Sequence, residues 1–387
     1  MLKSHPPRQA LQNAKSRILH AASPTLKHIP KRHNSTASPK PQAPRIIFSG
    51  IQPTGIPHIG NYLGALQNWA QLQETAEPGT KLFYSIVDLH AITVPQGKEN
   101  LGRWKRESLA TLLAVGLDPE KSTIFYQSSV SAHSELMWVL SCTASMGYLS
   151  RMTQWKSKLS LEDDASPFDG GNKSKLKLGL FSYPVLQAAD ILVHRATHVP
   201  VGQDQIQHLE FARECVTNFN HAYGPHLISP QTILSPTKRI MSLQTPTQKM
   251  SKSHSPLSRI LLTDTPDIVT KKISSALTDS YNNVSYSQSK RPGVANLLTL
   301  WSSFDTQVPK RSANQIAEEC RLKDVGLKDL KRETANAINT GLEGIRKGYE
   351  RVLRDEGYVE EVARKGGIRA RENAEETMVK VREAIGF

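Results

Sequence analysis

The sequence predicts an α/β protein whose first part is built on a parallel β-sheet and whose last part is entirely helical. Over residues 45–127, short apolar segments typical of buried strands alternate with segments of helical periodicity, the order expected for a parallel sheet. Beyond residue 255 the helical periodicity continues without strand-like segments. Apolar residues make up 38% and charged residues 22% of the 387-residue chain, as in soluble globular proteins.

Each predicted strand is a short run of β-branched and aromatic residues that ends at a turn or at a polar residue. The first strand, 45–49 (RIIFS), precedes a loop over 50–55 (GIQPTG) that is rich in turn residues. Further strands are expected over 82–87 and 123–127. Helices are expected from about 59, over 100–115, 132–160, 183–194 and 203–219, with a short apolar segment at 197–201 and a mobile polar loop at 161–175.

The chain is expected to divide into three parts. Residues 1–44 form a targeting segment and linker, 45–254 a catalytic domain with a helical insertion at about 132–195, and 255–387 a helical region. We expect the paired glycines Gly366-Gly367 to interrupt the last helix. The helices of this region are predicted over about 265–278, 294–304, 311–320, 327–353 and 358–385.

The first 44 residues have the composition of a mitochondrial transit peptide. They contain eight of the 49 Lys and Arg residues and no acidic residue, and the first acid of the chain is Glu74. Ser and Pro are frequent, and Leu11, Ile18 and Leu19 fall on one face of a short basic helix. The alternatives are a basic arm that touches nucleic acid and a plain unstructured tail. A mitochondrial matrix location is the expectation.

Several classes of protein are disfavoured by composition. No run approaches the 18 apolar residues that a membrane span needs, so no membrane association is expected. The three cysteines, Cys142, Cys215 and Cys320, are widely separated and form no CxxC pair, which supports neither a disulfide framework nor a metal site. The net charge of +14 permits binding of a polyanion such as RNA without establishing it.

The segment 57–61 (PHIGN) follows the loop after the first strand and opens a predicted helix. A helix N-terminus presents backbone N–H groups and a partial positive charge, both favourable to phosphate. His58 and Asn61 add side-chain donors, and Gly60 lets a flat ring approach the backbone. An ordinary turn with a capping role is the alternative for this segment taken alone.

The segment 249–253 (KMSKS) lies on a loop between Pro246 and Pro256. Two lysines on such a loop, Lys249 and Lys252, can close over phosphates as pyrophosphate departs. A solvated basic loop or a phosphorylation site is the alternative. Together with 57–61, the segment indicates attack on the α-phosphate of ATP, a reaction in which the protein supplies positioning and charge stabilisation.

The two segments resemble the HIGH-type and KMSKS motifs of class I aminoacyl-tRNA synthetases. The resemblance is closer to the tryptophanyl-tRNA synthetases of bacterial and mitochondrial type, and it extends from about Arg45 to the C-terminus. It implies a Rossmann-like catalytic domain and an anticodon-reading helical region. The segments that carry it are 48–55 (FSGIQPTG), 87–93 (VDLHAIT), 188–192 (AADIL), 199–205 (VPVGQDQ) and 239–243 (RIMSL).

The family resemblance implies a tryptophan pocket. Asp190 would accept the indole N–H, and His90 and Gln205 would hold the polar end of the amino acid. An acceptor left unpaired by the wrong amino acid rejects it strongly. Gln187 departs from the methionine of many bacterial members. The walls would comprise Phe48, Tyr183, Gln187, Ile191, Val199 and Val201.

The same resemblance implies an ATP site, with the nucleotide bound as its Mg²⁺ complex. Gln52 would face the α-phosphate, Gly202 and Asp204 the nucleotide or the substrate amine, and Lys158 the pyrophosphate. His58, Asn61, Lys249 and Lys252 would stabilise the charge of the phosphates. The remaining ATP-binding residues would be Gly60, Met241 and Ser251.

The implied activity is ligation of L-tryptophan to its tRNA through a tryptophanyl-adenylate, by a homodimer. Three alternatives remain open. A tyrosyl enzyme shares the architecture, but the AADIL segment around Asp190 favours indole. A small adenylyltransferase would lack the KMSKS loop and the helical tail. A non-catalytic RNA-binding protein on a synthetase scaffold is disfavoured by the intact phosphate-binding residues.

Overall fold

The computed structural model describes residues 44–159, 161, 162, 166, 176–202, 205–234, 239–252 and 254–387. Almost all of the expected transit segment and most of the predicted 161–175 loop therefore lie outside the described residues. The compact unit is Pro44–Phe387.

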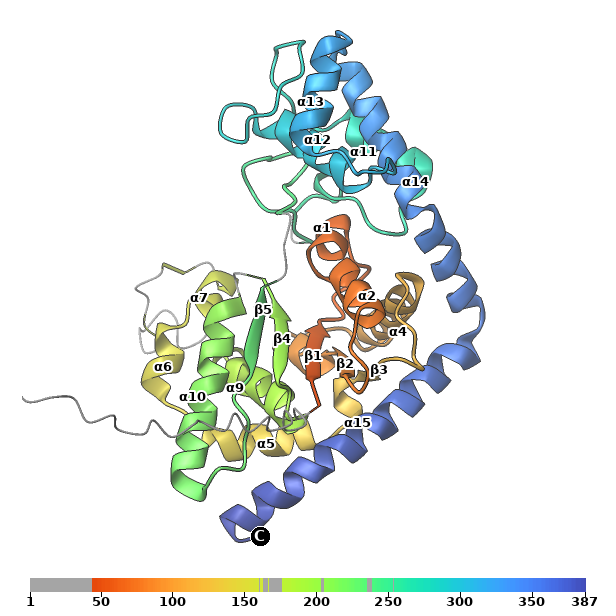
Figure 1. Cartoon of the computed structure of the whole chain (residues 1–387). Coiled ribbons are helices and arrows are strands. Elements are labelled where there is room, and N and C mark those ends of the chain that lie inside the picture. The colour runs from red at the N-terminus through yellow and green to blue at the C-terminus, as the bar shows by residue number, and fades with distance from the viewer. Residues whose placement is uncertain are drawn as a thin grey trace, which may run out of the picture. The chain divides into compact units, whose positions relative to one another are not determined.

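Five strands form one sheet in the order β3-β2-β1-β4-β5 (Figure 1). Every neighbouring pair is parallel, and β1 is in register with β2 from Ile46 opposite Lys81 to Ile51 opposite Ile86. The order reverses between β1 and β4, which is the point where open α/β sheets bind ligands beyond the carboxyl ends of their strands. The strands are β1 (Ile46–Ile51), β2 (Lys81–Ile86), β3 (Thr123–Tyr126), β4 (His198–Val201) and β5 (Gln231–Leu234).

Successive side chains of the central strands enter two separate cores. On β2, Leu82 and Tyr84 pack in one core, whereas Phe83 packs in the other. On β3, Ile124 and Phe125 divide in the same way. Since side chains alternate across a strand, both faces of the sheet are buried, which is why these strands read as continuous apolar runs.

Helices cover both faces of the sheet. The predicted helix at 132–160 is divided into three, and the helical run that starts at residue 59 passes through a π-helical turn, Tyr62–Leu66. The helices before residue 230 are α1 (Ile59–Asn61), α2 (Gln67–Glu74), α3 (Asp88–Ala91), α4 (Lys98–Ala114), α5 (Ala132–Ser141), α6 (Met146–Arg151), α7 (Gln154–Lys158), α9 (Leu178–Val193) and α10 (Ile206–Tyr223).

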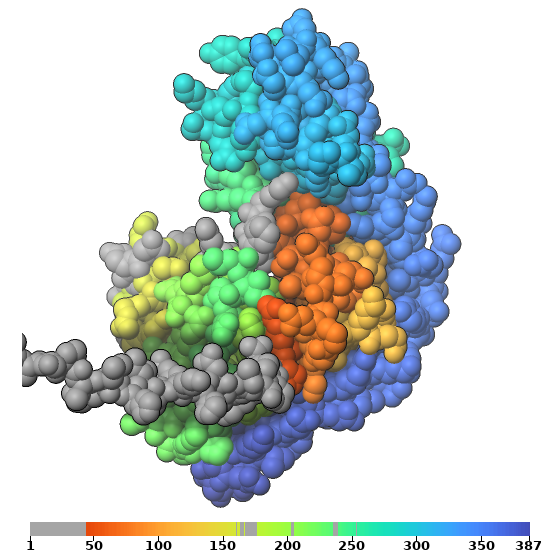
Figure 2. Space-filling view, in the orientation of Figure 1, coloured from red at the N-terminus to blue at the C-terminus, as the bar shows by residue number. Residues whose placement is uncertain are grey.

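The C-terminal region is helical, as predicted. Its last two helices also contact the α/β part: α14 packs on α4, and α15 packs on β3, α5 and α9. In Figure 2 the blue atoms of α14 and α15 lie against the orange atoms of α4. The placement of a domain boundary at 254/255 remains a prediction. The helices are α11 (Pro266–Ser274), α12 (Pro292–Ser303), α13 (Ala313–Leu322), α14 (Leu327–Arg354) and α15 (Glu356–Ile385).

The expectation that Gly366-Gly367 interrupts the last helix is wrong, because α15 is continuous through both residues. A Cβ atom on Gly366 would lie 1.8 Å from the carbonyl oxygen of Ile124 in β3. On Gly367 it would lie 2.8 Å from Oγ of Ser129. The glycines therefore allow α15 to approach the backbone of the sheet rather than ending the helix.

Within the described ranges, no helix combines the length and the apolar character needed to cross a membrane.

Candidate active site

A cavity of about 350 Å³ lies where the strand order reverses, between the carboxyl ends of β1 and β4. Its lining includes Phe48 from β1, Gln52 from the loop directly after β1, and Gly202, which directly follows β4. The cavity brings together every described residue of the predicted tryptophan set. Those residues are Phe48, His90, Tyr183, Gln187, Asp190, Ile191, Val199, Val201 and Gln205.

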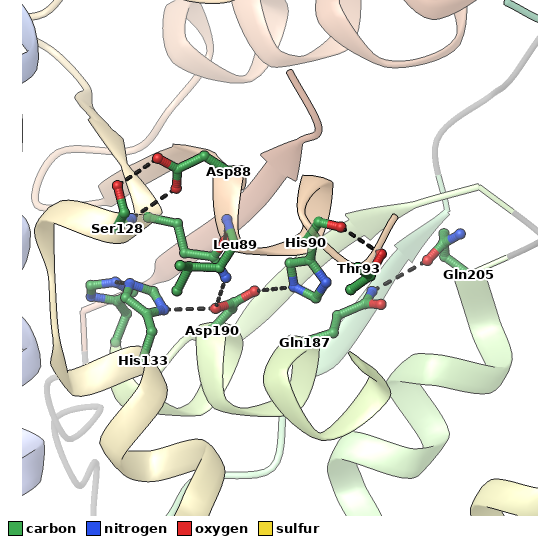
Figure 3. Close-up of polar contacts among 11 residues, drawn as sticks. Asp88, Leu89, His90, Thr93, Ser128, His133, Gln187, Asp190 and Gln205 are labelled. Carbon is green, nitrogen blue, oxygen red and sulfur yellow. Dashed lines mark hydrogen bonds and ion pairs between the residues drawn. The ribbon is translucent and has the colours of Figure 1, made fainter. Parts of the chain in front are cut away.

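Asp190, on α9, is 1% exposed, and its carboxylate receives three hydrogen bonds (Figure 3). Its Oδ2 accepts from Nε2 of His90 at 2.8 Å. Its Oδ1 accepts from Nδ1 of His133 and from Nε2 of Gln127, both at 2.7 Å. Burial alone would raise the pKa of Asp190, but the bonds from the two histidines outweigh it and hold the pKa below its usual range. The carboxylate is therefore ionised at neutral pH.

Aromatic and amide side chains surround the rest of the cavity. The Tyr183 hydroxyl lies 2.9 Å from both Oε1 of Gln154 and Nε2 of His208. The Lys158 ammonium lies 4.6 Å from the Tyr183 ring centroid, and burial lowers the pKa of Lys158. Gln187, at the position where methionine occurs in many bacterial members, donates from Nε2 to Oε1 of Gln205 at 3.2 Å (Figure 3).

His58 caps the helical run that follows it. Its Nδ1 accepts from the backbone N–H groups of Gly60 and Asn61 at 3.1 and 3.3 Å, and Oδ1 of Asn61 accepts from the backbone N–H of His58 at 3.1 Å. Burial and the nearby cations lower the pKa of His58 to about 3. The ring is therefore neutral, and because Nδ1 accepts, its hydrogen lies on Nε2. The capping role and a donor role toward phosphate are thus compatible.

The two motifs meet in the folded chain. A Cβ atom on Gly60 would lie 2.9 Å from the His58 ring and 3.7 Å from Cβ of Met250, which belongs to the 249–253 segment. The backbone of Ile59 donates to the carbonyl of Ile260 at 2.9 Å, so the chain after the second motif also pairs with the first. Residues about 190 positions apart are therefore in contact.

A bridge to the 239–243 segment holds the second motif. The N–H of Met250 donates to the carbonyl of Ile240 at 3.0 Å, and Met241 forms an antiparallel bridge with Lys249. Asn296, on α12, binds both backbone groups of Met241: Oδ1 accepts at 3.1 Å and Nδ2 donates at 3.0 Å. No pattern in the sequence distinguishes Asn296.

Lys252 contacts the loop after β1. Its Nζ donates to the carbonyl of Gly55 at 2.6 Å. Burial, followed by the charge of Arg259, lowers the pKa of Lys252 to about 8. A positive charge on this side chain is therefore costly until a negative partner arrives.

Some of the predicted ATP residues line the cavity, and others lie where the 57–61 and 249–253 segments are in contact. Gln52, Gly202 and Lys158 line the cavity. His58, Gly60 and Asn61 lie at the first motif, where Met250 of the second motif approaches Gly60. Lys249 bridges to Met241, and Lys252 contacts Gly55. Asp204 lies outside the described residues. Gln127 and His133 were missed, because a buried polar side chain has no distinguishing pattern in the sequence. The half-buried Gln154 was missed as well. The individual roles remain predictions.

A family model described as tRNA synthetases class I (W and Y) matches residues 40–343. A mitochondrial tryptophan–tRNA ligase of Schizosaccharomyces pombe is 43% identical over 88% of this chain and 95% of its own. A mitochondrial tryptophan–tRNA ligase of Saccharomyces cerevisiae is 42% identical over 88% of this chain and 90% of its own.

Among solved structures, a tryptophanyl-tRNA synthetase of Mycoplasma pneumoniae matches with a TM-score of 0.76 and 32% identity, covering 89% of this chain and 98% of its own. A Campylobacter jejuni tryptophanyl-tRNA synthetase, complexed with ADP and tryptophan, matches with a TM-score of 0.73 and 30% identity, covering 89% of this chain and 100% of its own. The TM-scores show that the fold of this chain is shared with these structures over most of its length. The chain belongs to the class I tRNA synthetase family of the W and Y type.

Proposed function

We propose that this chain ligates L-tryptophan to its tRNA in an ATP-dependent reaction that passes through tryptophanyl-adenylate. The observation that carries the proposal is the ionised Asp190 carboxylate in the wall of the cavity. The names of its relatives, which are tryptophan–tRNA ligases, support the same amino acid.

Recognition of tryptophan follows from the acceptor capacity of Asp190. A carboxylate has about four acceptor positions, and three of them are used by His90, His133 and Gln127. His90 lines the cavity, so Oδ2, with one partner, is the oxygen on that side. The indole N–H is the fourth donor. A side chain without a donor at this place leaves a buried charge under-solvated and is rejected.

In the first step, a carboxylate oxygen of tryptophan attacks the α-phosphorus of ATP in line. The bond between the α-phosphorus and the bridging oxygen breaks, and pyrophosphate leaves with the electron pair. The protein forms no covalent bond, so its contribution is orientation and stabilisation of negative charge. Gln52 lies at the α-phosphate, and Lys158, Lys249 and Lys252 carry the charge that the pyrophosphate needs. Nε2–H of His58 and the amide hydrogens of Asn61 donate to phosphoryl oxygens.

In the second step, a ribose hydroxyl of the terminal adenosine of the tRNA attacks the activated carbonyl, and AMP leaves. We assign Mg²⁺ to the phosphates of ATP rather than to a protein cage. Such ions keep most of their ligands from phosphate and water. Among the described residues, no group of three His, Cys, Asp or Glu side chains could hold a metal ion.

We also propose a location in the mitochondrial matrix and a homodimeric state. The acid-free N-terminal segment and the mitochondrial relatives support import into the matrix. A homodimer and reading of the anticodon by the helical region follow from the family resemblance, and the expectation of no membrane association follows from the lack of a long apolar run in the sequence. Sedimentation of the purified protein tests the dimer.

Tryptophan-dependent exchange between ATP and pyrophosphate, measured with residues 44–387, tests the activity. Exchange with tryptophan and little with tyrosine is expected. Exchange with tyrosine in place of tryptophan would assign the chain to the tyrosyl branch. Exchange with neither, in a protein that still binds tRNA, would favour an RNA-binding role on this scaffold.

A further inference from the structure

A series of buried polar contacts runs from Asp190, beyond the cavity, to the last helix, α15. Nε2 of His133, on α5, lies 3.3 Å from Nε2 of His194, at the end of α9. Nδ1 of His194 lies 2.9 Å from Oδ1 of Asn373, on α15. His133 and His194 are 0% exposed and Asn373 is 8% exposed, so this chain of contacts is closed to solvent. It joins α5, α9 and α15 behind the candidate tryptophan pocket.

We propose that Asn373, acting through His194 and His133, is a positioning residue for Asp190, so that the C-terminal helix takes part in selecting an indole N–H. The inference rests on the proposed recognition of tryptophan by Asp190. None of Asn373, His194 and His133 lines the cavity, so each acts through another residue.

The donor and the acceptor in each of these contacts can be assigned in turn, starting from Asn373. Oδ1 of Asn373 can only accept, so the hydrogen of His194 lies on Nδ1. Burial first, and then the neighbouring His133, lower the pKa of His194 to about 3, so its ring is neutral and its Nε2 accepts. The hydrogen between the two Nε2 atoms therefore belongs to His133. His133 also donates from Nδ1 to Asp190, so these contacts require a hydrogen on both of its ring nitrogens, which makes His133 the imidazolium partner of the carboxylate and holds the ring at both nitrogens.

These hydrogen bonds determine the orientation of the Asp190 carboxylate. Oδ1 of Asp190 is held by His133 and Gln127, outside the cavity lining, which leaves Oδ2 on the side of His90 and the cavity. Rotation of the carboxylate would break these charge-assisted bonds, which are stronger than neutral ones. An indole N–H therefore meets an acceptor whose direction is set before it binds.

His194 also supports an apolar wall of the cavity. Its ring stacks on Phe48, with centroids 5.6 Å apart, and on Phe83, with centroids 4.8 Å apart. Phe48 lines the cavity directly. The buried His194 ring thus contacts both His133, which binds Asp190, and Phe48 in the cavity wall. Loss of its hydrogen bond to Asn373 is therefore expected to alter the pocket.

The test is the Asn373→Leu variant, which replaces the amide by an apolar group of similar size. Calorimetry measures the affinity for tryptophan and for the analogue in which sulfur replaces the indole N–H. We expect the wild type to prefer tryptophan, and the variant to lose about tenfold of this preference through weaker tryptophan binding. Affinity for the analogue and KM for ATP should change less than twofold.

The chain offers a matched control one turn further along α15. Thr377 is 0% exposed, and its Oγ1 makes no hydrogen bond within the described residues. Thr377→Val should therefore keep the full preference. Equal loss of both ligands in Asn373→Leu would indicate a structural role and overturn the proposal, as would an unchanged preference.

If Asn373→Leu does not fold, Asn373→Ala, which removes the amide without adding bulk, replaces it in every comparison. A second position tests the middle of the route. In His133→Asn, the amide nitrogen replaces Nδ1 as donor to Asp190, whereas the link to His194 and the second ring hydrogen are lost. Its preference for tryptophan should fall, and Asn373→Leu should add nothing in that background. A full preference in His133→Asn, or additive losses in the double variant, would overturn the proposal. Binding needs no turnover, so absence of exchange by the wild type counts against the proposed function alone.

Discussion

Lys252 supplies the sharpest test of the electrostatic role assigned to the second motif. Burial lowers its pKa from 10.5 to about 8. About nine tenths of the side chains are then protonated at pH 7 and about one tenth at pH 9. If the ammonium stabilises departing pyrophosphate, kcat/KM for ATP should fall about tenfold between these values, because this parameter reports the free enzyme.

The assay is the initial rate of tryptophanyl-adenylate formation at ATP concentrations below KM, measured from pH 6.5 to 9.5. The control is Lys252→Arg, whose guanidinium stays charged throughout. The ratio of wild-type to variant rates removes any titration of the substrates. At saturating ATP the fall should move to higher pH, since bound phosphates favour the charged lysine.

The effect of the same group on stability has the opposite sign. The folded pKa of Lys252 lies below the unfolded value, so the unfolded chain binds more protons between about pH 8 and 10.5. The contribution of Lys252 to the free energy of unfolding therefore rises with pH across this window. Alkaline unfolding through this lysine cannot cause the expected loss of rate. Parallel profiles for the wild type and Lys252→Arg would refute the reasoning.

Three further substitutions test the site and the fold. Asp190→Asn keeps the size but removes the charge, so kcat/KM for tryptophan should fall at least about a hundredfold while KM for ATP changes little; equal losses for both substrates would contradict a specificity role. Asn296→Ala releases Met241, so adenylate formation should slow about tenfold with tryptophan affinity retained, and an unchanged rate would exclude this clamp. Gly366→Ala places its methyl group against Ile124 and should lower the free energy of unfolding in urea by about 1–3 kcal/mol or more. The control Gly344→Ala, on α14 with nothing within 4 Å, should raise it by about 0.4–1 kcal/mol, and similar values for both would contradict the close approach.

Most of the architecture could be predicted because it depends on neighbours in sequence. The strands β1, β2 and β3 are apolar runs that end at turns, and their positions agree with the expectation within a residue or two. The edge strand β5 was missed. Its four residues are half-buried or exposed, so it lacks the continuous apolar run of a central strand.

The candidate site was likewise predicted in part and missed in part. The family resemblance identified a set of residues that the fold gathers around one cavity, among them Phe48, Tyr183 and Asp190. It did not indicate what holds Asp190, because Gln127 and His133 lie 63 and 57 positions away in sequence. Nor could it indicate Asn296, which reaches Met241 from a different helix.

By itself, the sequence determined most of the strands and helices and the positions of the two motifs, because periodicity, turn chemistry and local spacing are carried by short stretches of chain. The acceptor expected to meet an indole, Asp190, came from the family resemblance of the segment around it. Only the tertiary structure decided that α15 runs unbroken past Gly366 and places Asn373 behind His194, 179 positions away. Contacts of that kind depend on how layers pack, and a polar or glycine residue has the same local pattern whether it ends a helix or supports a site.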